Sequence, residues 1–269
     1  MTFILKASVL GAALALTTSG AQAASVKVTI ENLSEENGLY LTPLLNVFHD
    51  GTYAGFTEGQ AASTQLEAIA EEGMVGSEID RVNALNIGAQ TAVATGPAGF
   101  GSMPGQPPVL DAGEVSSFTI DLDPTSNRYF SFLSMVIPSN DTFIGNSSAT
   151  AYELFDGAGL FTDLATIFVD IDDVWDGGTE ENDGQGAAFS TAGGTATDTT
   201  GTVSSVSSLD FLFGQPTAAG FIVDGADVGT RLASISFSQV APVPLPAGMP
   251  LLLVGLGVMG LARRRQNRS

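Results

Sequence analysis

The sequence contains no cysteine and only one histidine among its 269 residues. Without cysteine the chain cannot form disulfides, thiolate metal sites or a thiol nucleophile. The single histidine, His49, excludes the zinc and iron sites that need several imidazole ligands. Any metal site in this protein must therefore be built mainly from oxygen atoms.

Basic residues are also scarce: nine lysines and arginines stand against 29 acidic residues. Five of the nine lie in the first 23 or the last 27 positions, where no acidic residue occurs. The stretch between has four bases against 29 acids, a net charge of −25. So negative a surface repels phosphates, which argues against nucleic acid and anionic membrane surfaces as direct partners. Cations, and partners that bind through a bridging cation, are more compatible with this negative charge than nucleic acid or anionic membranes are.

Residues 1–23 have the pattern of a signal peptide. Lys6 gives a weakly basic start, an Ala/Leu-rich stretch follows, and Ala21-Gln22-Ala23 is a small-x-small cleavage pattern. We expect cleavage after Ala23 and export of the rest of the chain.

Residues 242–269 are expected to be a membrane-inserting tail. Residues 245–262 carry no charge, and 18 helical residues at about 1.5 Å each span roughly 27 Å, enough for a thin bilayer. Four arginines follow within 263–268, and such a cluster stays cytoplasmic, which leaves the rest of the chain outside.

This tail resembles the VPLPA variant of the PEP-CTERM sorting signal, on Val-Pro-Leu-Pro-Ala at 243–247, the Gly-rich apolar helix and the arginine cluster. The resemblance implies a Gram-negative bacterium that makes extracellular polysaccharide, and an exosortase-type enzyme that reads the tail. The protein would touch the inner membrane transiently, through this helix only, before it reaches the cell surface or the extracellular space. Such a tail directs sorting and gives no information on the chemistry of the domain that carries it.

Residues 24–241 are predicted to form one all-β domain, an antiparallel β-sandwich with one short helix. Alternating, β-branched and aromatic runs predict strands at 25–32, 39–48, 115–122, 128–137, 164–169 and 231–240. Pro43 favours an edge position or a bulge. The helix is predicted at 58–73, with Gly73 at its end. Residues 190–208, rich in Ser, Thr, Gly and Ala, predict a long surface loop or mobile excursion.

An acidic stretch at 170–183 places seven carboxylates around Trp175, the only tryptophan. Carboxylates this close repel one another unless the loop is well solvated or a cation binds there. Composition alone leaves both possibilities open. The stretch does not match an EF-hand, because Val174 stands at position five and the required glycine is missing.

Three segments, within 41–63, 134–145 and 175–183, resemble the spondin N-terminal domain family. The resemblance implies an eight-stranded antiparallel sandwich, similar to calcium-dependent phospholipid-binding sandwiches, with one calcium ion at the loop end. Family members look like extracellular adhesion or matrix modules. The Ser/Thr/Gly-rich segment and the absence of cysteine depart from the animal members.

By the same resemblance, Asp141, Asp176 and Glu180 align with the calcium ligands. Asp141 follows the predicted strand at 128–137, and Asp176 follows the one at 164–169, so neighbouring strand ends would bring them together. The glycines at 177–178 would let Glu180 reach the same ion. An all-oxygen set favours calcium over zinc. The other acids of the stretch are expected to lie outside the ligand set or face water: Asp170, Asp172, Asp173, Glu181 and Asp183.

The leading hypothesis is an exported, calcium-binding, non-enzymatic module for adhesion or matrix assembly, with an extracellular polysaccharide or a surface protein as partner. Two readings remain open: an enzyme that acts on extracellular polysaccharide through the acidic cluster, and a scaffold without metal. A catalytic His49 with a serine nucleophile is less favoured than a turn or packing histidine, since the sequence has no Gly-x-Ser-x-Gly motif.

Overall fold

The computed structural model describes residues 23–97 and 108–241. The expected signal peptide up to residue 22 and the whole of the sorting tail lie outside these described residues. Within the two ranges, no helix is long and apolar enough to cross a membrane.

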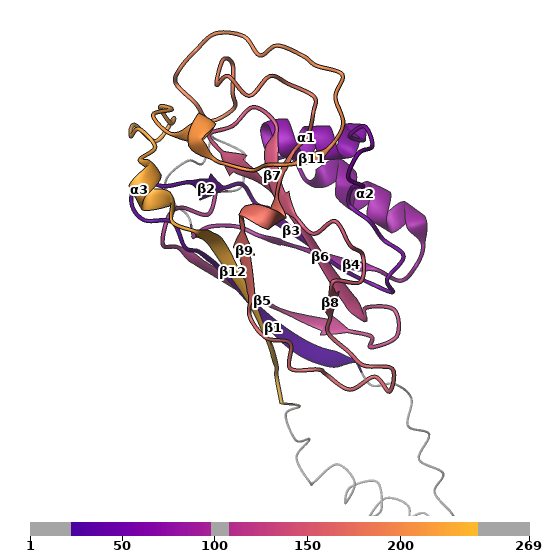
Figure 1. Ribbon diagram of the computed structural model, residues 1–269. Helices are drawn as coiled ribbons and strands as arrows, with labels where there is room; N and C mark the ends of the chain where they lie inside the picture. Colours follow the sequence, from indigo (N-terminus) through magenta and orange to yellow (C-terminus); the bar gives the residue numbers. More distant parts are fainter. Residues whose placement is uncertain (1–22, 98–107, 242–269) are drawn as a thin grey trace, which may run out of the picture.

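Two antiparallel sheets pack face to face and form the predicted all-β sandwich (Figure 1). The smaller sheet has the order β5 (Val115–Leu122), β1 (Ala24–Asn32), β12 (Arg231–Gln239), β9 (Ile167–Asp170). The larger sheet has the order β11 (Ser204–Ser205), β10 (Val174–Asp176), β7 (Thr142–Gly145), β6 (Tyr129–Ile137), β3 (Leu44–His49), β4 (Gln90–Ala94). The short strands β2 (Tyr40–Leu41) and β8 (Tyr152–Glu153) also pair with β6.

The period-two pattern of the strands divides the apolar residues between two cores. Val26 and Ile30 of β1 are fully buried between the sheets, in one cluster with Phe48 and Phe130 of the larger sheet. The side chains of opposite parity on β3, such as Val47, face the other side of that sheet and join a second cluster under the helices. Each large apolar side chain buried in this way contributes about 1.5–3 kcal/mol to folding.

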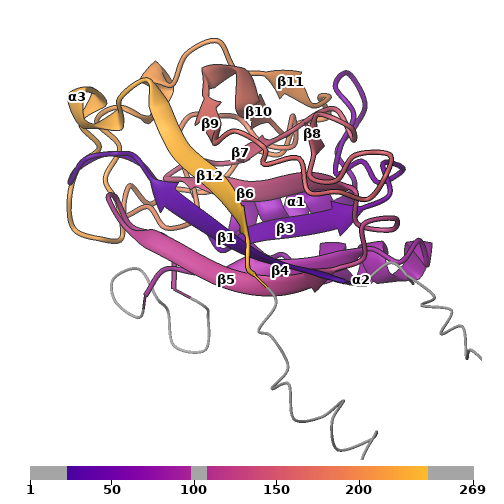
Figure 2. The same ribbon diagram turned by 90° about the horizontal axis from the view of Figure 1, so that it is seen from below.

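Helices α1 (Thr64–Glu72) and α2 (Gly76–Leu85) cover the outer face of the larger sheet (Figures 1 and 2). The predicted start of the helix at residue 58 is wrong, because Ser63 caps α1 by accepting a 3.2 Å hydrogen bond from the Leu66 amide. Its predicted end at Gly73 is confirmed, with φ at 68°. Helix α2 was not predicted, nor were the short α3 (Gly225–Val228) and the 3₁₀ turns Ile171–Asp173 and Asp210–Leu212.

Two predicted strands need correction. The run at 39–48 divides into β2 and β3 at Pro43; Leu45 lies four positions after Leu41, but their partners Val136 and Leu133 are only three positions apart. This extra residue is a bulge, as the proline predicts. The run at 164–169 forms only the four-residue β9, whose Phe168 is 41% exposed.

The first and last strands run side by side, and the Val240 amide donates a 2.8 Å hydrogen bond to the Ser25 carbonyl. The described chain therefore enters and leaves the domain at one end of the sandwich (Figure 1). The loop that follows β10 lies at the opposite end, over the start of β7 (Figure 1).

Candidate functional site

The pairing of β7 with β10 brings two of the three predicted ligands together. Asp141 immediately precedes β7, Asp176 ends β10, and Thr142 is the pairing partner of Asp176. The Gly177 amide closes the pair by donating a 3.0 Å hydrogen bond to the Asp141 carbonyl. The predicted strand context of Asp176 was wrong, because β9 belongs to the smaller sheet and β10 positions this residue instead.

The carboxylate of Asp141 is fully buried and accepts four hydrogen bonds. Its Oδ2 atom accepts from the backbone amides of Thr179 (2.8 Å) and Glu180 (3.0 Å) and from the Thr179 hydroxyl (3.2 Å). Its Oδ1 atom accepts from Nδ2 of Asn182 at 3.0 Å. Hydrogen bonds to an ionised carboxylate are stronger than neutral ones, so this buried charge is well compensated.

The same Nδ2 atom of Asn182 also donates to Oδ2 of Asp176, at 2.7 Å. A single amide nitrogen thus stands between the carboxylates of Asp141 and Asp176. The Gly178 amide donates to the other oxygen of Asp176 at 2.6 Å. Burial and the nearby charge of Asp141 raise the pKa of Asp176, against the lowering effect of these hydrogen bonds.

Glu180, the third predicted ligand, lies on the same loop with its side chain turned towards Asn140. Its Oε2 atom accepts a 3.3 Å hydrogen bond from Nδ2 of Asn140. Burial raises the pKa of Glu180, and the negative charges of Asp141 and Asp198 raise it further, while the bond from Asn140 lowers it. Asp176 and Glu180 therefore each lie within electrostatic reach of Asp141, but no interaction joins Asp176 to Glu180.

The Ser/Thr/Gly-rich segment packs along this loop and is held there by backbone hydrogen bonds. Thr199 donates to the Thr179 carbonyl at 2.6 Å, and Gly201 donates to the Gly178 carbonyl at 2.7 Å. The predicted surface loop is therefore tied to the site rather than free of it. A Cβ atom on Gly178, whose φ is 69°, would lie 2.7 Å from the backbone nitrogen of Thr202, so the close packing requires glycine here.

Sequence reasoning missed Glu71, which α1 directs towards the same loop. Burial raises the pKa of Glu71 to about 7; a hydrogen bond with Thr179 opposes the rise, and the charges of Glu180, Glu67 and Asp141 add to it. Glu67 and Glu71 stand one turn apart on α1, beside its buried face. The amphipathic pattern of the helix could have indicated this placement, but not the loop that the helix faces.

The remaining acids of the stretch have local roles or face solvent. Asp170 caps the 3₁₀ turn by accepting a 3.1 Å hydrogen bond from the Asp172 amide. Asp183 accepts from the Gln185 amide at 2.8 Å. Burial raises the pKa of Asp173 to about 6, and its backbone contact with Asp170 opposes the rise. Glu181 is exposed.

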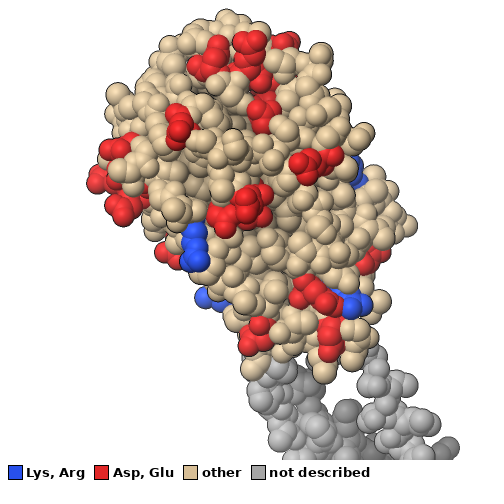
Figure 3. Space-filling model, in the orientation of Figure 1, with Lys and Arg blue, Asp and Glu red and all other residues tan. Residues whose placement is uncertain are grey.

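Acidic side chains gather over the loop end in Figure 3, whereas the basic side chains in that view lie elsewhere. Three described bases make these contacts with residues outside the loop: Arg81 pairs with Glu78, Arg128 with Glu153, and Arg231 stacks on Phe168. The loop end therefore carries negative charge that these bases do not neutralise.

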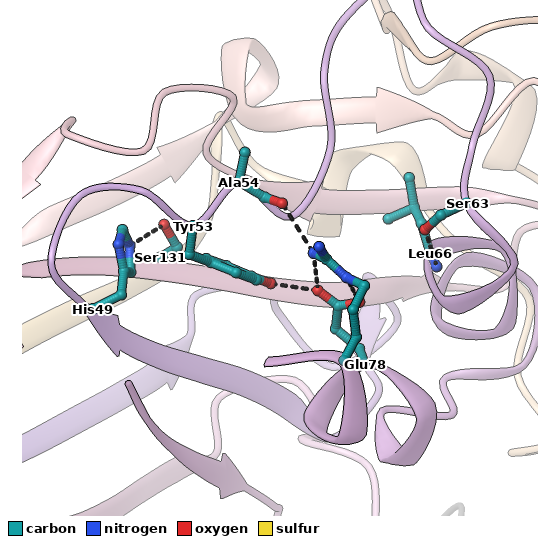
Figure 4. A network of polar contacts seen from close by, with 8 residues as sticks. His49, Tyr53, Ala54, Ser63, Leu66, Glu78 and Ser131 are labelled. Atoms are coloured by element: carbon teal, nitrogen blue, oxygen red, sulfur yellow. Dashed lines mark hydrogen bonds and ion pairs between the residues drawn. The ribbon is translucent and has the colours of Figure 1, made fainter. Parts of the chain in front are cut away.

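His49 is buried and has a packing role. Its Nδ1 atom accepts a 3.1 Å hydrogen bond from the Gly51 amide, so the proton is on Nε2, which donates to the Ser131 hydroxyl at 3.0 Å (Figure 4). A histidine that donates to the serine cannot act as its base. Burial lowers the pKa of His49 to about 4, although the charge of Asp50 opposes this, so the ring stays neutral.

Among the described residues, no three His, Cys, Asp or Glu side chains are arranged ready to hold a metal ion. The donor set nevertheless fits a hard cation in its chemistry: two carboxylates face one nitrogen, and the other side chains at that point are amides and hydroxyls. The Nδ2 atom of Asn182 lies 3.0 Å from the carboxylate of Asp141 and 2.7 Å from that of Asp176.

The family described as Spondin_N matches residues 34–210, more than half of the chain. The matched span contains Asp141, Asp176, Glu180 and Asn182. No curated protein sequence matches the chain.

Proposed function

The chain belongs to the Spondin_N family, and on that premise we propose that it is an exported, calcium-binding module for adhesion or matrix assembly at the cell surface. Membership of this family supports a non-enzymatic extracellular module. Calcium binding, adhesion and the route to the surface are the parts that we add.

The proposed calcium ligands are the carboxylates of Asp141, Asp176 and Glu180. The observation that carries the proposal is the approach of Asp141 and Asp176 to one nitrogen, within 3.0 Å and 2.7 Å. Calcium accepts six to eight oxygen atoms, so carbonyl groups and water would complete its shell. When bound, it would link the loop end of β7 to that of β10 and neutralise part of the local charge.

The proposed partner is an extracellular polysaccharide or a surface or matrix protein, met at the acidic loop end. The net charge of −25 between the two terminal segments supports a cation-bridged contact and argues against nucleic acid. The tail at 242–269, outside the described residues, would be read by an exosortase-type enzyme. Membrane contact would be made by this tail alone and would be transient.

Thermal unfolding of the purified protein in chelator and in millimolar calcium tests the proposal. A ligand present at 100 times its Kd adds about 2.7 kcal/mol of stability, and each kcal/mol raises Tm by roughly 2–4 °C in a chain of this size. We therefore expect Tm to rise by several degrees in calcium. The rise should disappear in Asp141→Asn and Asp176→Asn but persist in Glu181→Gln, an exposed acid of the same stretch.

If calcium changes Tm in neither the wild type nor any of the three variants, calcium binding is contradicted. The hypothesis of a scaffold without metal would then be favoured. Turnover of an extracellular polysaccharide that Asp176→Asn abolishes without loss of fold would instead show an enzyme. Calcium-dependent retention on extracellular matrix, lost in chelator, is the result expected of an adhesion module.

A further inference from the structure

The orientation of the Asn182 side chain is determined by three neighbours. Its Nδ2 atom donates to Asp141 and to Asp176, and its Oδ1 atom accepts a 3.2 Å hydrogen bond from the hydroxyl of Thr142. An amide NH2 has two hydrogens, so each carboxylate receives one of them. The side chain of Thr142 is fully buried and so holds the oxygen side of the amide in place.

The Asn182 amide reduces the electrostatic repulsion between the carboxylates of Asp141 and Asp176. Two ionised carboxylates directed at one point repel each other, and the repulsion grows as water is excluded. Asp141 is fully buried, and Arg81, Arg128 and Arg231 make their contacts elsewhere. The partial positive charge of the Asn182 NH2 group is what lies between the two aspartates.

We propose that Asn182 is a placeholder for the cation: it holds Asp141 and Asp176 in position when no metal is bound, and its amide must turn away before calcium binds. The inference rests on the proposed function. Calcium sits about 2.3–2.6 Å from its oxygen ligands, so it cannot share the point with a nitrogen 2.7–3.0 Å from the same carboxylates. Binding must therefore displace two charge-assisted hydrogen bonds.

Two consequences follow. The domain keeps its loop end folded without calcium, because the amide supplies the link that the ion would supply. Calcium affinity is lower than the carboxylates alone would give, because the fraction of molecules with the amide displaced is small, and the apparent Kd rises as that fraction falls.

The test compares wild type, Asn182→Ala and Asn37→Ala by thermal unfolding in chelator and in calcium chloride, and by calorimetric titration with calcium chloride. Asn37 is a matched control because its Nδ2 atom donates to a single carboxylate, Asp227, at 3.2 Å and far along the chain. We expect Asn182→Ala to have a lower Tm in chelator, a larger rise of Tm with calcium, and a Kd for calcium roughly three- to tenfold lower than wild type. Asn37→Ala should change neither Kd nor the rise of Tm.

A weaker calcium affinity in Asn182→Ala would overturn the inference, since it would make Asn182 a ligand. An unchanged Tm in chelator would overturn it as well, since the amide would then hold nothing. If wild type itself binds no calcium, the proposed function fails, and the melt in chelator still decides whether the amide holds the aspartates.

Asn182→Asp is a second variant, expected to be the most destabilised in chelator and to recover most in calcium.

Discussion

Thr142 of β7 and Asp176 of β10 are direct partners in the antiparallel ladder. This pairing sets the separation of Asp141 from Asp176, because Asp141 is the residue before Thr142. A slip of one residue in either strand would turn the side chain of Asp176 to the opposite face of the sheet. The candidate site therefore depends on the register of two strands that have only four and three residues.

Asp141→Asn should destabilise the protein even in chelator. The substitution removes the charge that four donors now stabilise and replaces one acceptor oxygen with a donor. We expect a loss of about 1.5–3 kcal/mol in the free energy of unfolding, measured by urea denaturation. Glu181→Gln is the control, and an equal loss in both variants would show that the effect is one of net charge.

Gly178→Ala should loosen the Ser/Thr/Gly-rich segment. Alanine at φ 69° costs about 1–2 kcal/mol in backbone strain, and its Cβ would also lie within 2.8 Å of two backbone atoms of Thr202. Gly193→Ala is the matched control, since its φ is 74° and no atom lies within 4 Å of its Cβ. Hydrogen exchange at 197–203 should accelerate in Gly178→Ala only, and equal rates would contradict the contact.

Tyr53→Phe should destabilise the attachment of α2. The Tyr53 hydroxyl donates a 2.6 Å hydrogen bond to the fully buried Glu78, whose carboxylate also pairs with Arg81 (Figure 4). Loss of one donor to a buried carboxylate should cost about 1.5–3 kcal/mol in the free energy of unfolding. Tyr129→Phe, which removes a hydroxyl from a half-buried ring, is the comparison in the same denaturation assay and should cost less.

Asp111→Asn should change how stability depends on pH. Burial, and then the charge of Glu114, raises the pKa of Asp111 from 3.8 to about 6. The unfolded chain then binds fewer protons than the folded one between about pH 4 and 6, so this group lowers stability as pH rises through that window. The stability of the variant relative to wild type should therefore increase from about pH 4 to pH 6 and stay at the higher value above pH 6.

The comparison with wild type at each pH is needed because His49 acts with the opposite sign. Its pKa falls from 6.5 to about 4 on folding, so the unfolded chain binds more protons and stability rises with pH across that range. The difference between Asp111→Asn and wild type removes this contribution. A difference in Tm that stays constant from pH 4 to 8 would contradict the raised pKa of Asp111.

The longest strands could be predicted from the sequence because their own patterns specify them. β1, β5, β6 and β12 have eight or nine residues each, with clear alternation or a continuous apolar run. The short β7 and β10 were missed, since strands of four and three residues are stabilised by their neighbours rather than by their own pattern.

The three predicted ligands came from the family resemblance, whereas Asn182 and Glu71 depend on contacts between distant segments. The distances from Asn182 to Asp141 and from α1 to the loop exist only after the larger sheet has assembled. No local pattern around Asn182 distinguishes it from an ordinary loop asparagine. Strand pairing and helix packing, which the sequence does not encode locally, decide which polar groups share the site.

The chain enters the domain through β1 and leaves it through β12 at the same end, and this arrangement has a mechanical consequence. A pull between the end of β12 and a partner held at the loop end would run along the strands. The hydrogen bonds from β12 to β1 and β9 lie across that direction, so they would carry the load together in shear instead of breaking one at a time. A domain anchored by this end would therefore resist mechanical unfolding when force is applied at the loop end.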